Sequence, residues 1–588
     1  MRMKLLLTGS AIALGMALTA TPAQAQFVCD SEAAGESGAG ATAVGAFSFA
    51  CGDSSAAAGN NTTAVGSFAS ATADFATGIG TSTNTSGIAS TGVGAFTDIS
   101  GADTIAIGYN RDTTASQAVL VGNAATVGGT GAVAVGFSAD ATAAGAVAIG
   151  QNSSATATDT VAVGQGAQAL ASNATALGDL ALADGGFSTA VGANADSGGL
   201  ASTAVGASAN AAGSFASAYG ELANAAGIQS TAIGSNSDAL GTFSTAVGVL
   251  ANASADSSTA LGDSANATNT GATAVGFSSS ASGINAIAVG DSTADFNNSI
   301  TMGTSADVSG LNAIAIGLNT DAGADGVAVG NDSNASANAV AIGLANNATG
   351  DGAVAIGDPN TATGTGAVAI GANNTATGDG AVAEGNLNTA TGQGAVALGN
   401  LSTATGEGSV AIGDAAISGT NGVAIGNGAS NGVFTNSVAL GTGVTNTANN
   451  QVAVGGQSAA TARVVTGVGL GAISATSWDA INGQQLNATN NRVTALELED
   501  IAINNRIDDS NDRSASGSAV AIAMGGAMFL PDKTFNLTGN VGTYRGAWAG
   551  ALNAGALISP NAAINAGIGA GFNKKGKVGA RAGFTFGW

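Results

Sequence analysis

The most regular feature of the chain is a short apolar phrase in which large and small side chains alternate before a glycine. In the segment Ala146–Gly150, Val147 and Ile149 share one face of an extended strand, and Ala146 and Ala148 share the other. A helix would need apolar residues at a spacing of about 3.6, and glycine at this density would weaken it. The alternation therefore predicts short β-strands with one aliphatic face and one alanine face.

The phrase recurs with a period of 14 residues. Its closing glycine advances in unbroken steps of 14 from Gly66 to Gly290, slips by one residue several times up to Gly343, and regains the period from Gly357 to Gly413. A half-period is also visible, because Thr-Ala-Thr-Gly ends at Gly364, seven residues before Gly371. We therefore predict two strands and two turns per unit, with glycine reaching positive φ at both turns.

Stacked units of this kind predict a parallel β-solenoid. About 30 coils at ~4.8 Å per coil would give a rod of about 140 Å. Two strands enclose little volume, which accounts for the use of alanine where a β-sandwich would use leucine. A single thin roll buries too little apolar area to be stable by itself, so we expect the head to pack laterally against other copies of the chain.

The pattern changes after residue 462, where a heptad repeat begins. Its core positions are Leu486, Val493, Leu496, Ile503 and Ile507, interrupted by Thr489 and Asp500. This seam of about three heptads predicts a short coiled coil, with an isolated amphipathic helix as the alternative. Isoleucine at core positions favours trimers or higher oligomers over dimers.

The last 55 or so residues alternate again, now in longer runs. We predict four strands, over residues 535–544, 545–558, 561–573 and 577–588, preceded by a helix rich in Ala, Gly and Ser within residues 514–530. The apolar face of the fourth strand ends in Phe584, Phe586 and Trp588. Strands of this length with one apolar face and terminal aromatics are typical of outer-membrane barrels, and a soluble antiparallel sheet is the alternative. Four strands cannot close a barrel, whereas three chains would supply twelve.

Composition and charge exclude several classes of function. The chain has a net charge of −24, and Arg111 is the only basic residue between positions 5 and 462. The head therefore offers no footprint for nucleic acid, and its acidity is explained by solubility. There is no histidine and no catalytic carboxylate pair with supporting residues, so we expect neither an enzyme nor a bound cofactor or metal.

The first 25 residues have the pattern of an export signal. Arg2 and Lys4 precede an apolar run, and a small-x-small site predicts cleavage between Ala25 and Gln26; an uncleaved anchor helix is the alternative. Export to an oxidising compartment makes Cys29 and Cys51, the only cysteines, candidates for a disulfide. Free or inter-chain thiols are the alternatives.

The whole chain resembles the trimeric autotransporter adhesins (YadA-like, type Vc secretion). The resemblance rests on the 14-residue repeats, the C-terminal strands, and a phrase similar to the family's neck motif: Asp479, Ala480, Ile481, Asn482, Gly483, Gln484, Gln485 and Leu486. It implies a left-handed parallel β-roll head over residues 26–462, a neck over 463–487, a trimeric coiled-coil stalk over 488–513, and a membrane anchor over 514–588. The chain departs from the family in its short stalk and in ending on Trp588 where phenylalanine is common.

The resemblance also implies partners and a place in the cell. We expect a homotrimer on the surface of a Gram-negative bacterium, with the anchor inserted in the outer membrane by the barrel-assembly machinery and supporting export of the head. The expected ligand is an extracellular matrix protein or another surface. A protein for self-association and biofilm formation is the main alternative. An ice-binding or purely structural solenoid is a further alternative, raised by the threonine pairs that begin at Thr361 and Thr363.

Overall fold

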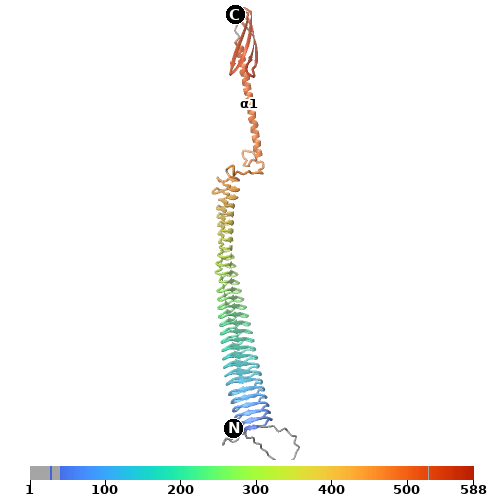
Figure 1. Ribbon diagram of the computed structural model, residues 1–588, viewed down its shortest axis with the longest axis vertical. Coiled ribbons are helices and arrows are strands. Elements are labelled where there is room, and N and C mark those ends of the chain that lie inside the picture. Colours follow the sequence, from blue (N-terminus) through green and yellow to red (C-terminus); the bar gives the residue numbers. More distant parts are fainter. Residues whose placement is uncertain (1–26, 30–39, 457, 527–528, 531) are drawn as a thin grey trace, which may run out of the picture. The chain divides into compact units, whose positions relative to one another are not determined.

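The computed structural model describes residues 27–29, 40–456, 458–526, 529–530 and 532–588. The predicted cleavage site between Ala25 and Gln26 lies outside these residues. The chain divides after Arg463 into two compact units, each of which is described by itself (Figure 1).

The first unit is a parallel β-solenoid, as predicted. Among the described residues, one strand from each coil joins a single 31-stranded sheet along the unit (Figure 1). The strands of this sheet are two to five residues long, and they include β1 (Phe27–Cys29) and β57 (Val452–Ala453). Successive coils stack in register: β17 (Val147–Ile149) pairs with β19 (Val161–Val163), which sets Val147 beside Val161. Each coil usually adds a second strand of two or three residues, such as β18 (Ser154–Ala155), and these shorter strands form separate sheets on the other side.

Alanine fills the interior of the coils, which confirms the predicted use of the two strand faces. Ala146 and Ala148 are fully buried, whereas Ile149 is 39% exposed. Columns of buried alanines extend through the stacked coils on both strands, in two long clusters over residues 99–294 and 306–416. The interior is therefore only about one methyl group deep on each side, and most large aliphatic side chains remain outside it.

The two glycine positions of the repeat differ in backbone conformation, and only one of them has the predicted positive φ. The repeat glycines do have positive φ, for example 134° at Gly150. The half-period glycines do not: the prediction is wrong at Gly364, where glycine is required because a Cβ would collide with the backbone carbonyl of Gly378 in the next coil. The turn positions with φ near 55° carry mostly residues other than glycine, such as Leu180 with φ of 54° and Phe187 with φ of 59°.

A ladder of buried asparagines runs inside the coils from Asn346 to Asn388. Asn360 donates from its backbone N–H and its Nδ2 to Asn346 Oδ1, at 2.9 and 3.1 Å, and Asn374 repeats both bonds to Asn360. The long strands lengthen to five residues over these coils, as in β47 (Val368–Ala372) and β49 (Val382–Asn386). Each asparagine side chain forms hydrogen bonds with the neighbouring coils, so the amides can be buried without loss of partners. The same bonds fix the register in which the coils stack.

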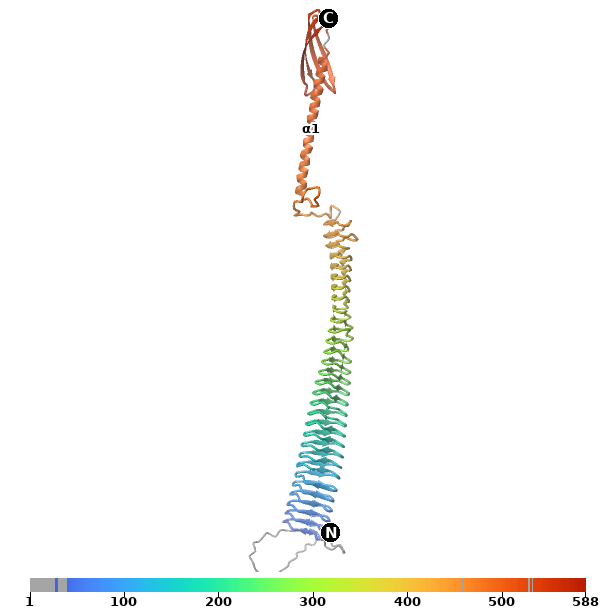
Figure 2. The ribbon, with the colours of Figure 1, turned by 180° about the vertical axis from the view of Figure 1, so that it is seen from behind.

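The second unit combines one long helix with a four-stranded antiparallel sheet. Helix α1 (Gly483–Met524) begins at a capping box, in which Asn482 Oδ1 accepts from the Gln485 N–H at 3.0 Å. The strands are β58 (Phe535–Tyr544), β59 (Ala547–Ser559), β60 (Ala562–Gly571) and β61 (Val578–Phe586), paired in that order. Figure 2 shows α1 in orange leading into the red strands. The heptad segment and the predicted inner helix are thus one continuous helix. No helix of the described chain is both long enough and apolar enough to span a membrane.

Candidate functional site

The outward face of the 31-stranded sheet is mostly apolar. The side chains that flank the buried central residue of each strand are mostly Val, Ile, Leu or Thr, and many remain partly exposed; examples are Ile149, Leu177, Leu261, Ile342 and Leu440. An extended apolar face of this kind is typical of an interaction surface.

Glu384 interrupts this apolar face. Its Cα partners in the neighbouring coils are Ile370 and Leu398, and its side chain is exposed. The carboxylate thus lies in an outward aliphatic column and outside the alanine interior.

The opposite face, formed by the short strands, is a polar ladder. Asn84 Nδ2 donates to Asp98 Oδ1 at 2.8 Å, and Asn224 Nδ2 donates to Asp238 Oδ1 at 2.9 Å. Acidic residues also stack on this face, as Asp307 does on Asp321. Elsewhere on the same side, burial, and then the nearby Asp184, raise the pKa of Asp196 above its usual range. Farther along, Thr361, Thr375, Thr389 and Thr403 stand in register.

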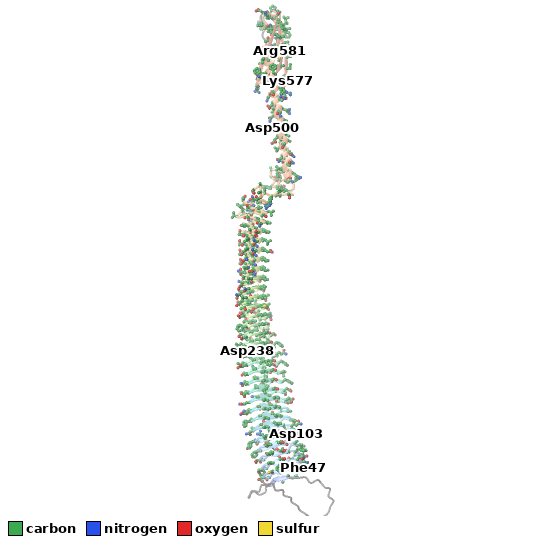
Figure 3. All side chains as sticks on the ribbon, in the orientation of Figure 1. Phe47, Asp103, Asp238, Asp500, Lys577 and Arg581 are labelled. Atoms are coloured by element: carbon green, nitrogen blue, oxygen red, sulfur yellow. The ribbon has the colours of Figure 1, made fainter. Side chains whose placement is uncertain are left out.

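The turns between the two faces expose large apolar side chains. Phe47 projects from the edge of the coils near the start of the described head (Figure 3). Farther along one edge, an apolar ridge comprises Phe187, Leu200, Phe215, Ile228 and Phe243, each of them about half exposed or more. Phe187, Phe215 and Phe243 all hold a left-handed backbone conformation, which bulky residues rarely adopt.

The four-stranded sheet has the two faces expected of a membrane strand. Its outward residues include Trp548, Leu552, Ile568, Phe584 and Phe586, and all are exposed in the single chain. Its inward face is lined by glycine and asparagine and carries the end of α1. A Cβ on Gly542 would meet Ala519 and Ala523, and one on Gly579 would lie 2.8 Å from Met524 Cε. The small inward residues therefore make room for the helix against the sheet.

Family models match both units. The YadA head domain repeat (2 copies) matches ten overlapping or separate stretches, over residues 128–153, 141–167, 155–181, 169–195, 239–265, 267–293, 297–320, 337–358, 362–388 and 390–416. The YadA-like membrane anchor domain matches residues 529–588. The chain belongs to the YadA-like trimeric autotransporter adhesins. It is anchored in the outer membrane and exposed on the cell surface. No curated protein matches it.

In this YadA-like chain, three residues of the predicted neck phrase fold the preceding segment back onto the start of α1. Gln485 Nε2 donates to the Gly471 carbonyl at 2.6 Å, and Gln485 Oε1 accepts from the Gly471 N–H at 3.1 Å. Asn482 Nδ2 donates to the Val468 carbonyl, and Asp479 Oδ2 accepts from the Ala472 N–H. The remaining residues of the phrase, Ala480, Ile481, Gly483, Gln484 and Leu486, have no such bond among those the structure gives. The neck assignment itself stays a prediction.

The predicted coiled-coil core lies on α1 and is not covered within the single chain. Leu486, Val493, Leu496, Ile503 and Ile507 are all exposed. Asp500, also labelled in Figure 3, interrupts the stripe as predicted from the sequence. An apolar stripe of this kind is typical of a helix that packs against another element, and the coiled coil stays a prediction.

The two cysteines occupy matching positions in neighbouring strands. Cys29 in β1 and Cys51 in β3 (Phe49–Cys51) are Cα partners in a parallel pair. Parallel neighbours lie about 4.8 Å apart, inside the range of about 4.4–6.8 Å that a disulfide needs. The disulfide remains a prediction that the backbone geometry permits.

The structure buries one charged side chain in the head that the sequence pattern does not predict to be buried. Arg111 is only 3% exposed, and its guanidinium donates to the backbone carbonyls of Tyr109 and Ala125 inside the coil. Burial lowers the pKa of Arg111, and the neighbouring Asp112 opposes that shift. The residue stands in the column that alanine, serine, threonine or asparagine fills elsewhere, which only the three-dimensional register makes evident.

Proposed function

We propose that three copies of this chain form one surface adhesin with a shared twelve-stranded membrane barrel. The observation that carries the proposal is the anchor sheet, in which β58 and β61 each pair on one side only among the described residues. Open sheet edges in a bilayer leave backbone N–H and C=O groups without partners, at a cost of several kcal/mol each. Three chains joined edge to edge remove every such edge.

The head and the helix support the same stoichiometry. The outward Val, Ile and Leu columns of the long-strand sheet would face one another around a threefold axis, which covers the apolar face of each roll. The uncovered seam of α1 would form the stalk in the same assembly. The anchor would support export of the head and would itself depend on the barrel-assembly machinery of the outer membrane.

The proposed activity of the head is attachment, either to an extracellular matrix protein of a host or to other cells of the same kind. Once the long-strand faces meet in the trimer, the polar ladder and the turn ridges remain for contact with a ligand. Both are long and repetitive, so we expect binding energy to be distributed along the head. Self-association is the second candidate, because the apolar ridge from Phe187 to Phe243 is the kind of surface on which two heads could pack.

Surface expression tests the proposal directly. The full chain would be produced in a Gram-negative host, beside a variant that lacks residues 40–455 but keeps the signal, neck, helix and anchor. Autoaggregation and binding to immobilised matrix proteins would be measured on the same cells. Gain of either property with the full chain alone supports adhesion and identifies its partner class. Equal behaviour of the two strains, at matched surface levels, would refute it.

A further inference from the structure

We infer that Arg581 binds the carboxyl-terminal turn of α1 from a neighbouring chain and so locks the helix of one subunit to the barrel wall of another. The inference rests on the trimeric anchor proposed above. It begins from a cluster of polar atoms on the inward face of the sheet that the single chain leaves without partners.

These atoms are almost all hydrogen-bond donors. Among the described residues of this inward face, the buried side-chain atoms without a partner are Arg581 Nε, Asn536 Nδ2, Asn540 Nδ2, and both Nδ2 and Oδ1 of Asn553. Asn553 is only 2% exposed. The four donor atoms outnumber the single acceptor atom, so they cannot all pair with one another. Exchanging the O and N atoms of one amide would not remove the imbalance. Because an unpaired buried polar group is costly, acceptors from elsewhere must approach this face.

The position of Arg581 points to the end of an α1 helix as the source of those acceptors. Gly579, two residues earlier on the same inward face, contacts the last turn of α1, since a Cβ there would lie 2.9 Å from Val520 Cγ1. Arg581 is therefore the next inward residue beyond Met524, where α1 ends. It also stands in one row across the sheet with Gly567 and Asn553, and Figure 3 labels it within the anchor.

The carboxyl-terminal end of α1 is partly capped: the Gly525 N–H donates to the carbonyls of Ala521 and Ile522, which leaves those of Ala523 and Met524 for other donors. The last carbonyls of a helix lack intrahelical donors and carry the negative end of the helix dipole. The last turn of α1 contains no basic residue. The guanidinium of Arg581 has several N–H donors and a permanent positive charge, which suits it to a group of carbonyl oxygens.

The neighbouring chain supplies these oxygens. Within one chain, the structure records no bond from Arg581 Nε to α1. Arg581 belongs to β61, an open edge of the sheet, so it lies at the seam where the next chain's β58 and α1 would meet it. Three chains would then place three guanidinium groups around three helix ends.

Cysteine cross-linking tests which chain is contacted. In the full-length protein with Cys29→Ser and Cys51→Ser, the pair Arg581→Cys and Met524→Cys would be oxidised in the outer membrane. We expect covalent dimers and trimers on a boiled, non-reducing gel. The control pair, Val520→Cys with Gly579→Cys, joins residues already in contact within one chain and should run as a monomer. An intrachain bond for the first pair, or none where the control forms, would overturn the inference.

A second measurement reports the contribution of the charge. Unheated in detergent, the parent protein should migrate as a trimer and dissociate at a defined temperature. Arg581→Met should lower that temperature, Arg581→Lys should restore part of it, and Arg545→Met in the exposed β58–β59 turn should leave it unchanged. An Arg581→Met trimer as heat-resistant as the parent contradicts the inference alone. A parent protein that is monomeric under all conditions contradicts the proposed trimer instead.

Discussion

Cys29 and Cys51 are Cα partners in the parallel pairing of strands β1 and β3. This pair lies at the first strand pairing that the structure describes in the head, where a solenoid has a terminal coil with a partner on one side only. A covalent link there would hold the first strand against the stack.

We therefore predict that the exported protein contains a Cys29–Cys51 disulfide. Closing a loop of this length stabilises a protein by about 3 kcal/mol. Peptide mapping without reductant should recover the linked pair, and Cys51→Ser should lower the melting temperature of the head. Two alkylated cysteines recovered from protein exported under oxidising conditions would exclude the bond.

Glu384 should be a weak point of the assembled head. Replacing it with isoleucine continues the aliphatic column between Ile370 and Leu398, so Glu384→Ile should stabilise the trimer by about 1–2 kcal/mol per chain. Glu407→Ile, the same change at an exposed turn, is the matched control and should have little effect. Thermal unfolding of the purified head measures both. A lower melting temperature for Glu384→Ile would show that the carboxylate has a partner in the assembly.

The asparagine ladder should be energetically important. Asn374 donates to Asn360 Oδ1 and to the carbonyls of Ile370 and Gly385, and accepts from Asn388. Asn374→Ala removes these bonds and leaves buried partners unsatisfied, so we expect a loss of about 2–4 kcal/mol. Thr377→Ala on the exposed face of the same coil should change stability by less than about 0.5 kcal/mol. Equal melting temperatures for the two variants would contradict this role.

The acidic pair of Asp184 and Asp196 predicts a pH dependence. Since the pKa of Asp196 is raised in the folded head, the folded state holds its proton more tightly than the unfolded chain does. Stability should therefore fall as the pH rises from the ordinary carboxyl pKa through the raised value. Asp196→Asn should flatten that part of the profile and stabilise the head at neutral pH. Asp184→Asn should do so in part, because it removes only the charge repulsion. A profile unchanged by both substitutions would refute the assignment.

The sequence predicted the strands and their faces well because a period of two is a direct consequence of the pleat. It predicted the anchor strands for the same reason, and Phe584 and Phe586 do lie on an exposed apolar face. It could not predict which asparagines are buried. Asn374 and Asn373 are adjacent and chemically identical, yet one lies inside the ladder and the other in an exposed turn. That difference depends on how one coil aligns with the next.

The helix and the inward face of the anchor show the same limit. In the sequence, the heptad segment and the small-residue segment within 514–530 look like separate elements. The first has the apolar spacing of a coiled coil, and the second has the small residues that fit against a glycine-lined sheet. They join in α1 since no residue between them ends the helix. The inward position of Arg581 follows from the alternation along β61, but the lack of an acceptor for its Nε becomes evident only when every neighbouring polar atom is placed.

The in-register stacking of the coils also bears on how such a head can change over generations. Removing or duplicating one 14-residue unit, such as residues 365–378, would rejoin equivalent positions, so Thr361 would meet Thr389 as it now meets Thr375. The alanine interior and both outer faces would continue without a new side chain being needed. Recombination between near-identical repeats can therefore adjust the reach of this protein in steps of about 4.8 Å.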